Sequence, residues 1–320
     1  MKNKKILIIG GTGALGKTLI KLYQKDNQIR VFSRDEHKQV YLSSLSTTSK
    51  NVSFMIGDIK DKDSIRNAIE DFKPEIVINA AALKHVPICE INPYESVNVN
   101  IIGHQNLLEA VRRSSYKIET LIYVSSDKAC KPVNIYGMCK AISERLYIEF
   151  AKKQQDIKVC LVRYGNVLES TGSVIPYFKQ LLSSKTDHLP ITDMRMTRFL
   201  LTLEEAAKLI EWTYNSANSH GKIAIPKVKS FKISDVAKAL IKFYDKDQTN
   251  IQLKVVGIRK GEKLHEEMRS NEEWMRTIEY ENYLIGDEIV IDEIKSYNSL
   301  DSVMPESEVY DYLIKSGVLI

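Results

Sequence analysis

Residues 125–140, SSDKACKPVNIYGMCK, bring together side chains that can move protons. Asp127 and Lys128 are an adjacent acid and base. Tyr136 and Lys140 lie four residues apart, a spacing that places two side chains on the same face of a helix. A phenol has an unperturbed pKa near ~10, so it is a poor base at neutral pH. An ammonium one turn away favours the phenolate, which would make Tyr136 a proton acceptor.

A structural role for the same residues is the simpler alternative. Tyr136 would then be a buried aromatic residue, Lys140 a solvated charge, and Asp127 with Lys128 a surface pair capping the helix. For an isolated Tyr-x-x-x-Lys pattern this alternative would be preferred. The surrounding sequence has to decide, because it determines whether these side chains reach a ligand.

Short apolar runs alternate with amphipathic segments over the first part of the chain. Runs without polar alternation are typical of strands buried on both faces, which indicates a parallel sheet covered by helices. Strands alternating with helices predict an α/β, Rossmann-like doubly wound fold. We expect strands at 4–10, 28–33, 52–58, 75–81, 120–126 and 158–165, and helices at 14–25, 62–71, 93–115 and 134–153.

This fold would place the 125–140 segment at a binding edge. The run TLIYVSS ends at Ser126, and the acid and base follow it at the carboxyl edge of the sheet, where open parallel sheets bind ligands. Ser125 or Ser126 could hold a substrate hydroxyl there. The sequence therefore predicts a catalytic group made of Ser126, Asp127, Lys128, Tyr136 and Lys140.

The stretch IIGGTGALG (8–16) follows the first predicted strand and opens a helix. Glycine lets the chain turn sharply, lets backbone N–H groups approach a pyrophosphate, and lets helix and strand pack closely. A glycine triplet alone is a weak signal, but its place at the first strand–helix junction is the one the dinucleotide motif requires. The predicted cofactor contacts here are Gly10, Thr12, Gly13, Ala14, Leu15 and Gly16.

The end of the second strand indicates which dinucleotide binds. Sites that prefer NAD commonly end this strand with an acid that holds the ribose hydroxyls, whereas Ser33 and Arg34 occupy the place here, with Lys38 nearby. A guanidinium suits a 2′-phosphate, so we expect NADP, although Asp35 argues the other way. Later strand ends would complete the cofactor site, with Asp58 and Ile59 near the adenine and Ala80 and Ala81 where the cofactor crosses the sheet edge.

Beyond residue 165 the alternation loosens. We expect an NADP-binding domain at 1–165 and a smaller substrate-binding lobe at 166–320, which would close over the sheet rather than fold independently, with some crossing of the chain. The lobe should hold strands at 189–193, 222–226 and 251–257 and helices near 203–216, 233–243 and 261–269. The tail from about residue 271 shows little periodicity and suggests no function.

Composition excludes several classes of protein. The 320 residues are 43% hydrophobic and 27% charged with a net charge of +5, and lysines alternate with acids, which argues against nucleic-acid binding. Four cysteines form no CxxC pair, so reduced thiols in a cytoplasmic protein are expected. No stretch approaches the ~18–20 apolar residues of a membrane helix, so we expect no membrane association. The neighbours of His85 and His265 supply no metal-ligand spacing, so we expect no metal site.

Five blocks carry a family resemblance. GGTGALG, the serine-rich end of the fifth strand and Tyr136-x-x-x-Lys140 resemble the extended short-chain dehydrogenase/reductase superfamily. The match narrows to the UDP-N-acetylglucosamine 4,6-dehydratases and is closest to the C5-inverting kind. The stretches that resemble these enzymes are AAALKHVPICEINPYESVNVNIIGHQNL (80–107), SSDKACKPVNIYGMCK (125–140), VRYGNVLESTGSVIPYF (162–178), PITDMRMTRF (190–199) and GIRKGEKLHEEM (257–268).

The resemblance implies an internal redox reaction. Tyr136 would remove the C4 hydroxyl proton while hydride leaves C4 for tightly held NADP, and the resulting ketone would acidify the proton at C5. Lys128 would take that proton, and Asp127, as a protonated acid, would give one to the departing C6 hydroxyl. Hydride would then return to C6 and a proton to C5 from the opposite face. The product would be UDP-2-acetamido-2,6-dideoxy-L-arabino-hexos-4-ulose.

The same resemblance implies a UDP-sugar site in the second half of the chain. Arginine suits a pyrophosphate and a carboxylate suits a ribose diol, so Arg259 and Glu262 are expected at the nucleotide end. The further substrate contacts expected are Asn166, Ser173 and Val174 beside the sugar and uracil, Arg198 at a phosphate, and Lys84 by the sugar.

Relatives of this kind pack two long helices between subunits, so the resemblance also implies a homo-oligomer, a dimer or larger. Three other functions remain open at the level of sequence. They are a C5-retaining 4,6-dehydratase, a nucleotide-sugar 4-epimerase, and an NADP-sensing binding module. Asp127 and Lys128 argue against the epimerase, and the presence of both Tyr136 and Lys140 argues against the sensor.

Overall fold

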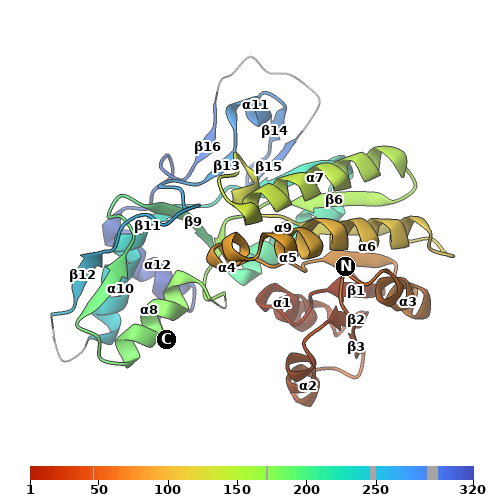
Figure 1. Cartoon of the computed structure of the whole chain (residues 1–320), viewed down its shortest axis with the longest axis horizontal. Coiled ribbons are helices and arrows are strands. Elements are labelled where there is room, and N and C mark those ends of the chain that lie inside the picture. Colours follow the sequence, from red (N-terminus) through yellow and green to blue (C-terminus); the bar gives the residue numbers. More distant parts are fainter. Residues whose placement is uncertain (46, 171, 246–249, 287–294) are drawn as a thin grey trace.

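The computed structural model describes residues 1–45, 47–170, 172–245, 250–286 and 295–320. At its centre lies a sheet of nine described strands in the order β14-β15-β10-β6-β5-β4-β1-β2-β3 (Figure 1). Seven of them, from β10 to β3, run parallel, and β15 and β14 add an antiparallel edge. The strands are β1 (Lys5–Ile9), β2 (Gln28–Ser33), β3 (Val52–Ile56), β4 (Ile76–Asn79), β5 (Thr120–Val124), β6 (Lys158–Val162), β10 (Ile223–Pro226), β14 (Thr277–Glu279) and β15 (Tyr283–Gly286). The doubly wound prediction and its first six strands are confirmed.

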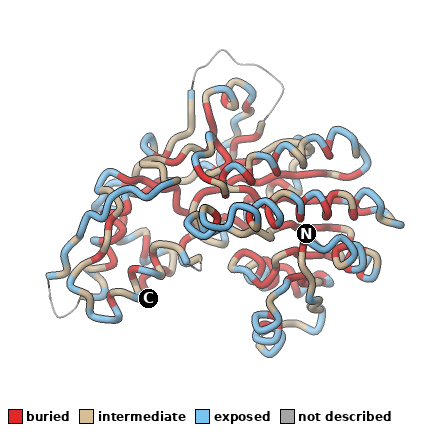
Figure 2. Tube along the Cα trace, in the orientation of Figure 1, coloured by how far each residue is buried: buried red, intermediate tan, exposed pale blue. Residues whose placement is uncertain are grey.

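Helices cover both faces of the sheet, as its apolar strands require. On one face, α3 (Lys62–Phe72), α6 (Gly103–Arg112) and α7 (Ile135–Lys153) pack around a core that includes Leu107 and Tyr147. On the other face, α1 (Ala14–Tyr23) and α9 (Leu203–Asn215) pack with Leu19 and Ile210. Figure 2 shows the resulting buried strands between exposed outer helix surfaces. A short helix that the sequence did not suggest, α2 (Glu36–Ser44), follows β2.

The helix expected at 93–115 is interrupted. The structure has α4 (Val86–Ile91), α5 (Pro93–Val97), a π-helical turn η1 (Asn98–Ile102) and then α6. Within the wide turn, the Asn100 side chain accepts a hydrogen bond from Leu83 N and donates one to Leu83 O, both 2.9 Å. Single π-turns of this type often occur at functional sites. Here the turn ties the helix to the loop that follows β4.

A second lobe packs around its own core, with Phe178, Leu189, Phe231 and Leu240 fully or almost fully buried. Between its elements, the chain returns to the main sheet with α9 and β10, so it crosses the boundary expected at residue 165. No helix within the described ranges is long and apolar enough to cross a membrane. The lobe elements are β7 (Asn166–Val167), α8 (Val174–Ser183), β8 (His188–Ile191), β9 (Thr197–Leu201), β11 (Ser230–Lys232), α10 (Ile233–Tyr244), β12 (Gln252–Val255) and α12 (Glu306–Lys315). The short η3 (Ala217–Ser219) follows α9 and lies against β6 of the main sheet.

Two expectations for the C-terminal part are wrong. No helix forms at 261–269; the chain makes a turn at Gly261, with φ of +81°, and then a strand, β13 (Glu267–Arg269), that pairs with β16 (Tyr297–Asn298). Backbone carbonyl groups of residues 263 and 264 accept hydrogen bonds from Arg198, which removes them from a helical ladder. The tail is also not featureless, because it contributes α11 (Asn271–Trp274), β14, β15 and α12; residues 287–294 of it lie outside the described chain.

Candidate active site

The predicted acid and base lie in one 3₁₀ turn, η2 (Asp127–Ala129), at the carboxyl end of β5. The Ser126 hydroxyl donates a hydrogen bond to Asp127 Oδ1 (3.0 Å), and Lys128 Nζ donates to the same oxygen (3.1 Å). Asp127 is completely buried, and its Oδ2 has no hydrogen-bond partner within the described chain. The turn therefore holds an acid and a base in direct contact and leaves one buried carboxylate oxygen available.

Tyr136 is buried in the first turn of α7, beside this acid–base pair. The helix starts at Asn134, whose side chain accepts a hydrogen bond from Gly137 N (2.8 Å). Burial raises the pKa of the Tyr136 hydroxyl, and the hydrogen bond with the Ser126 hydroxyl offsets part of that increase. Ser126 thus connects the phenol of α7 to the carboxylate of η2.

Lys140 lies one turn further along α7 and is also buried. Its Nζ donates to the Val124 carbonyl oxygen (2.8 Å) and lies 4.7 Å from the centre of the Tyr123 ring. Burial lowers the pKa of Lys140 to about 7. The structure therefore does not show the lowered phenol pKa expected for Tyr136, because desolvation dominates the pKa of both groups.

Lys128 also contacts the second lobe. Its Nζ lies 3.4 Å from Asn166 Oδ1 and 3.6 Å from Glu266 Oε1. Burial lowers the pKa of Lys128, but the charges of Asp127 and Glu266 outweigh burial and leave the pKa raised. The predicted pair is thus part of a row in which one ammonium lies between two buried carboxylates.

A buried ionic network lies behind the catalytic candidates. Arg163, which follows β6, donates to both oxygens of Glu144 (2.9 and 2.6 Å) and to both oxygens of Glu273 (2.8 and 2.8 Å). Glu144 is one turn beyond Lys140 on α7 and also accepts a hydrogen bond from the Ser125 hydroxyl (2.6 Å). Because Glu273 belongs to α11, this network fastens the C-terminal segment to β5, β6 and α7.

The glycine turn between β1 and α1 is built as the sequence predicts. Gly10 has φ of +78°, and a Cβ there would lie 2.8 Å from Ala81 Cα, so only glycine fits against the end of β4. A Cβ on Gly16 would lie 2.2 Å from Gly11 O, which shows how closely the helix packs on the turn. Gly13 starts α1 without a side-chain cap, and Ala14 and Leu15 follow in its first turn. The helix start therefore leaves N–H groups available for an anion.

The end of β2 holds the residues expected to select the cofactor. The Thr12 hydroxyl donates to the Ser33 hydroxyl (3.1 Å), and both residues are buried. The Arg34 side chain is 57% exposed and lies 3.9 Å from Glu95. Asp35 caps α2 by accepting from Lys38 N (3.0 Å) and also binds the Lys38 ammonium. Asp35 is thus used to cap α2, while the Arg34 side chain is exposed.

The two later strand ends also reach this edge. Asp58 Oδ1 accepts a hydrogen bond from Lys60 N (2.9 Å), and Ile59 is buried against Gly103. Ala80 and Ala81 follow β4, where Ala81 N donates to the Asn79 side chain (3.2 Å). The structure therefore brings the predicted cofactor residues of β1, β2, β3 and β4 to the carboxyl edge of one sheet.

The predicted substrate residues lie on several loops around the same edge. Lys84 Nζ donates to the Ser170 hydroxyl (2.7 Å), which links the loop after β4 to the second lobe. Ser173 starts α8, its Oγ is buried without a hydrogen-bond partner in the described chain, and Val174 follows it. Arg198 is buried and donates from its terminal nitrogens to backbone carbonyl groups, so these donors are already used.

Arg259 and Glu262 lie on one turn, in which Glu262 accepts a hydrogen bond from Arg259 N (3.2 Å). The Asn134 side chain donates to Gly261 O (2.8 Å), so this turn is attached to the start of α7. Arg259 is exposed. The turn therefore lies near the end of α7 that carries Tyr136.

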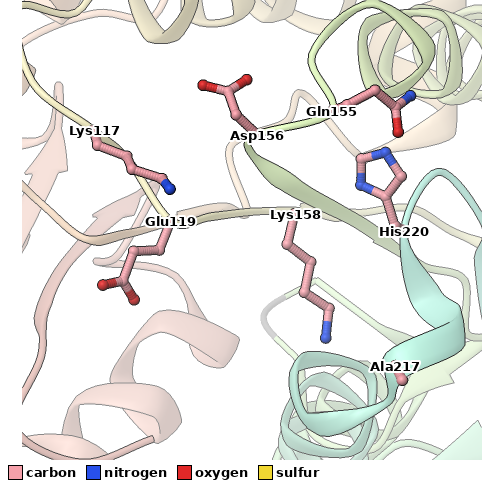
Figure 3. Close-up of a pocket in the computed structure, with 7 residues that line it drawn as sticks. All are labelled: Lys117, Glu119, Gln155, Asp156, Lys158, Ala217 and His220. Carbon is pink, nitrogen blue, oxygen red and sulfur yellow. The ribbon is translucent and has the colours of Figure 1, made fainter.

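A separate hollow of about 520 Å³ lies at the other edge of the sheet (Figure 3). Its lining includes Lys117, Glu119, Lys158 and His220, at the amino ends of β5 and β6. Two of the charged groups have internal partners: Glu119 binds Lys4, and Lys158 donates to two backbone carbonyl groups. Since the acid and base follow the carboxyl end of β5, this hollow is not part of the candidate site.

Comparison with known proteins agrees with this geometry. Residues 6–288 match the family model described as polysaccharide biosynthesis protein. The chain belongs to this family. Among curated relatives, the inverting UDP-N-acetylglucosamine 4,6-dehydratase of Campylobacter jejuni subsp. jejuni serotype O:2 is 43% identical over 290 residues, which are 88% of this chain and 83% of the relative. A UDP-glucose 4-epimerase of Rickettsia bellii is 36% identical over 289 residues, 88% of this chain and 82% of the relative.

Solved structures share the fold of this chain. Pen from Bacillus thuringiensis has a TM-score of 0.90 and 31% identity, and the match covers 100% of this chain and 99% of Pen. The dTDP-glucose 4,6-dehydratase DesIV from Streptomyces venezuelae, solved with NAD, has a TM-score of 0.70 and 17% identity, and the match covers 81% of this chain and 86% of DesIV. The family resemblance expected from the sequence is confirmed.

Sequence reasoning missed four acidic and basic groups of the site. Glu144 could have been found, because it follows Tyr136 by eight residues and Lys140 by four, and so lies on the same helix face. Arg163 is the one charged residue after Lys158 in the strand predicted at 158–165, which is another usable signal. Glu266 and Glu273 come from the part expected to be helix or irregular tail, and no local pattern marks either of them.

Proposed function

We propose that this protein is a UDP-N-acetylglucosamine 4,6-dehydratase that inverts C5, a lyase with 5-epimerase activity. The observation that carries the proposal is the 43% identity to an inverting dehydratase, extending over 88% of the chain. The arrangement of Tyr136, Ser126, Asp127 and Lys128 in one connected group supports it, since an epimerase needs no acid for a departing C6 hydroxyl.

We further propose a nicotinamide dinucleotide as the bound cofactor, and NADP in particular. The close approach of Gly10 to Ala81 and the open start of α1 suit a pyrophosphate. Asp35 is used as a helix cap, and Arg34 is exposed and only 3.9 Å from Glu95 Oε1, so a 2′-phosphate would compete with Glu95 for the guanidinium. When bound, the nicotinamide would supply an acceptor that takes a hydride from C4 and returns it at C6.

The protein's own residues would move the protons. Tyr136 would take the C4 hydroxyl proton, with Ser126 holding that hydroxyl in line and Lys140 favouring the phenolate. A shift of one proton from Lys128 to Asp127, which are 3.1 Å apart, would produce the amine and the carboxylic acid that the next step needs. Lys128 would then take the C5 proton, and Asp127 would protonate the departing C6 hydroxyl.

The nucleotide end of the substrate would lie along the loops of the second lobe. Arg259 would bind the pyrophosphate and Glu262 the ribose, as their residue types suit. The remaining proposed substrate contacts are Lys84, Asn166, Ser173, Val174 and Arg198, of which Arg198 would first have to release a backbone carbonyl group to bind a phosphate.

Incubation with UDP-N-acetylglucosamine in D2O tests the proposal. Appearance of a C6 methyl group with deuterium at C5 is expected, with ring proton couplings of the inverted product. Couplings of the uninverted sugar would identify the retaining enzyme, a product without a methyl group the epimerase, and no product the sensor. Tyr136→Phe should reduce turnover by about 10²–10⁴-fold while leaving cofactor binding close to that of the wild type.

We also propose a homo-oligomer. Exposed apolar side chains gather on neighbouring helices, with Ile91 74% and Tyr94 87% exposed at α4 and α5, and Met138 45% and Ile142 47% exposed on α7. Apolar patches of this kind mark interaction surfaces. Light scattering should show at least a dimer, and Tyr94→Glu with Ile142→Glu should shift it to a monomer; a monomeric wild type would contradict the proposal.

A further inference from the structure

Glu266 is a buried carboxylate that no sequence pattern placed in the site. Its side chain is 4% exposed, and its Oε1 lies 3.6 Å from Lys128 Nζ and 3.8 Å from Arg198 Nε. Its Oε2 lies 3.8 Å from Lys263 Nζ and has no hydrogen-bond partner in the described part of the chain. A buried charge is strongly destabilising unless it is paired. Three cations around one carboxylate therefore indicate a position built to hold negative charge.

The three cations are held in different ways. Arg198 donates to three backbone carbonyl groups and Lys263 to another, so the main chain fixes both of them. Lys128 is held instead by side-chain oxygens, with Asp127 on one side and Glu266 on the other. Lys128 can therefore change its protonation without breaking a backbone interaction.

We propose that Glu266 is the permanent counter-ion of Lys128 during the reaction, a positioning residue that stays ionised while Asp127 exchanges its proton. This inference rests on the proposed function. When a proton moves from Lys128 Nζ to Asp127, one N–H bond breaks and one O–H bond forms. The amine and the acid that result are both neutral, and Glu266 remains as the charged carboxylate beside them.

The charge of Glu266 matters at the following step. When Lys128 takes the C5 proton it becomes an ammonium again, now beside a neutral Asp127, and Glu266 faces it at 3.6 Å. A fixed charge directed at the place where opposite charge develops lowers the barrier of that step. Oxidation at C4 transfers the C4 hydroxyl proton to Tyr136 and does not change the charge of Lys128. Glu266 should therefore assist the C5 step and not the C4 step.

The test compares Glu266→Gln with the wild type and with Glu267→Gln. Glutamine keeps the size of the side chain and removes its charge. Glu267 is the next residue, lies on β13 and pairs with Lys131 at 3.1 Å, so it is a matched control. With UDP-N-acetylglucosamine in D2O, deuterium incorporation at C5 should slow on the order of 10- to 100-fold in Glu266→Gln, while C4 oxidation changes by less than about threefold. Single-turnover absorbance of the reduced nicotinamide measures C4 oxidation.

Three outcomes separate the possibilities. Glu266→Asp keeps the charge and should retain more C5 exchange than Glu266→Gln. If the glutamine variant does not fold, the comparison of Glu266→Asp with the wild type still tests the inference. Equal loss of both steps in Glu266→Gln, or C5 exchange as fast as in Glu267→Gln, overturns the inference. A wild-type protein that forms no C6 methyl group and exchanges no C5 proton contradicts the proposed function itself, before any variant is compared.

Discussion

Replacement of Arg163 by methionine would test how the C-terminal segment is fastened to the catalytic half. Arg163 is 1% exposed and makes paired hydrogen bonds with Glu144 and with Glu273. Methionine keeps a long unbranched side chain and removes the charge. Both carboxylates would then lose their principal partner while the space stays largely filled.

The expected loss of stability follows from the burial of the two carboxylates. Removing one member of a buried ion pair destabilises a protein by about 3–5 kcal/mol, because a charge is left buried without a partner. The Glu144 side chain is 4% exposed and that of Glu273 is 25% exposed, so Glu144 should account for most of the effect and Glu273 can be partly hydrated. We expect the free energy of unfolding at pH 7 to fall by ~4 kcal/mol.

This loss should shrink as the pH falls. Burial raises the pKa of Glu273, but the charge of Arg163 outweighs it and lowers the pKa from 4.5 to about 2. A lowered carboxyl pKa stabilises the wild type above the unfolded value, and that contribution disappears between about pH 4.5 and about pH 2. In Arg163→Met the unpaired buried carboxyls should take up protons more readily than in the unfolded chain. The variant should therefore regain stability above about pH 4.5, as these carboxyls become protonated, whereas the wild type loses stability below it.

Urea unfolding followed by tryptophan fluorescence would measure the effect, because the buried Trp274 is next to Glu273. Arg276→Met is the matched control, since Arg276 is exposed on the same segment and should change stability by no more than ~0.5 kcal/mol. A loss below about 1 kcal/mol at pH 7 for Arg163→Met would refute the reasoning on burial. An equal loss at pH 7 and pH 4 would refute the reasoning on protonation.

Three further predictions concern the cofactor and catalytic sides of the site. Lys140→Met should be more stable than the wild type, increasingly so as the pH falls from about 10.5 to about 7, because burial lowers the pKa of Lys140 to about 7 and the unfolded chain binds the proton more readily. Chemical denaturation across that range checks this, and a difference independent of pH would contradict it. Gly10→Ala should lower stability by about 1–3 kcal/mol and weaken dinucleotide binding, because its φ is positive and Ala81 leaves no space for a Cβ. Melting curves and titration calorimetry measure both, and unchanged NADP affinity would count against the site. Arg34→Ala should weaken NADP binding about tenfold and NAD binding much less; equal effects in calorimetry would show that Arg34 does not contact the 2′-phosphate.

Local sequence patterns correctly predicted the strands that are buried on both faces of the sheet. The first six strands are apolar runs because both of their faces are covered, and Gly10 and Gly16 mark the turn because a Cβ does not fit at either position. The pattern failed at 261–269, where apolar and charged residues have helical spacing but Arg198 binds the backbone carbonyl groups. At 93–115 the expected helix forms over 93–112, but the pattern did not predict its π-turn, in which Asn100 binds Leu83.

By itself, the sequence determined the doubly wound sheet, the glycine turn and the presence of Ser126, Asp127, Lys128 and Tyr136 at one strand end, since each depends on neighbours within a few residues. Only the tertiary structure decided which charges surround them. Glu266 lies 138 positions beyond Lys128 in the chain, yet the two side chains meet at 3.6 Å because β13 folds back against η2. Electrostatic interactions act through space and not along the chain, so a pairing of this kind leaves no trace in local spacing.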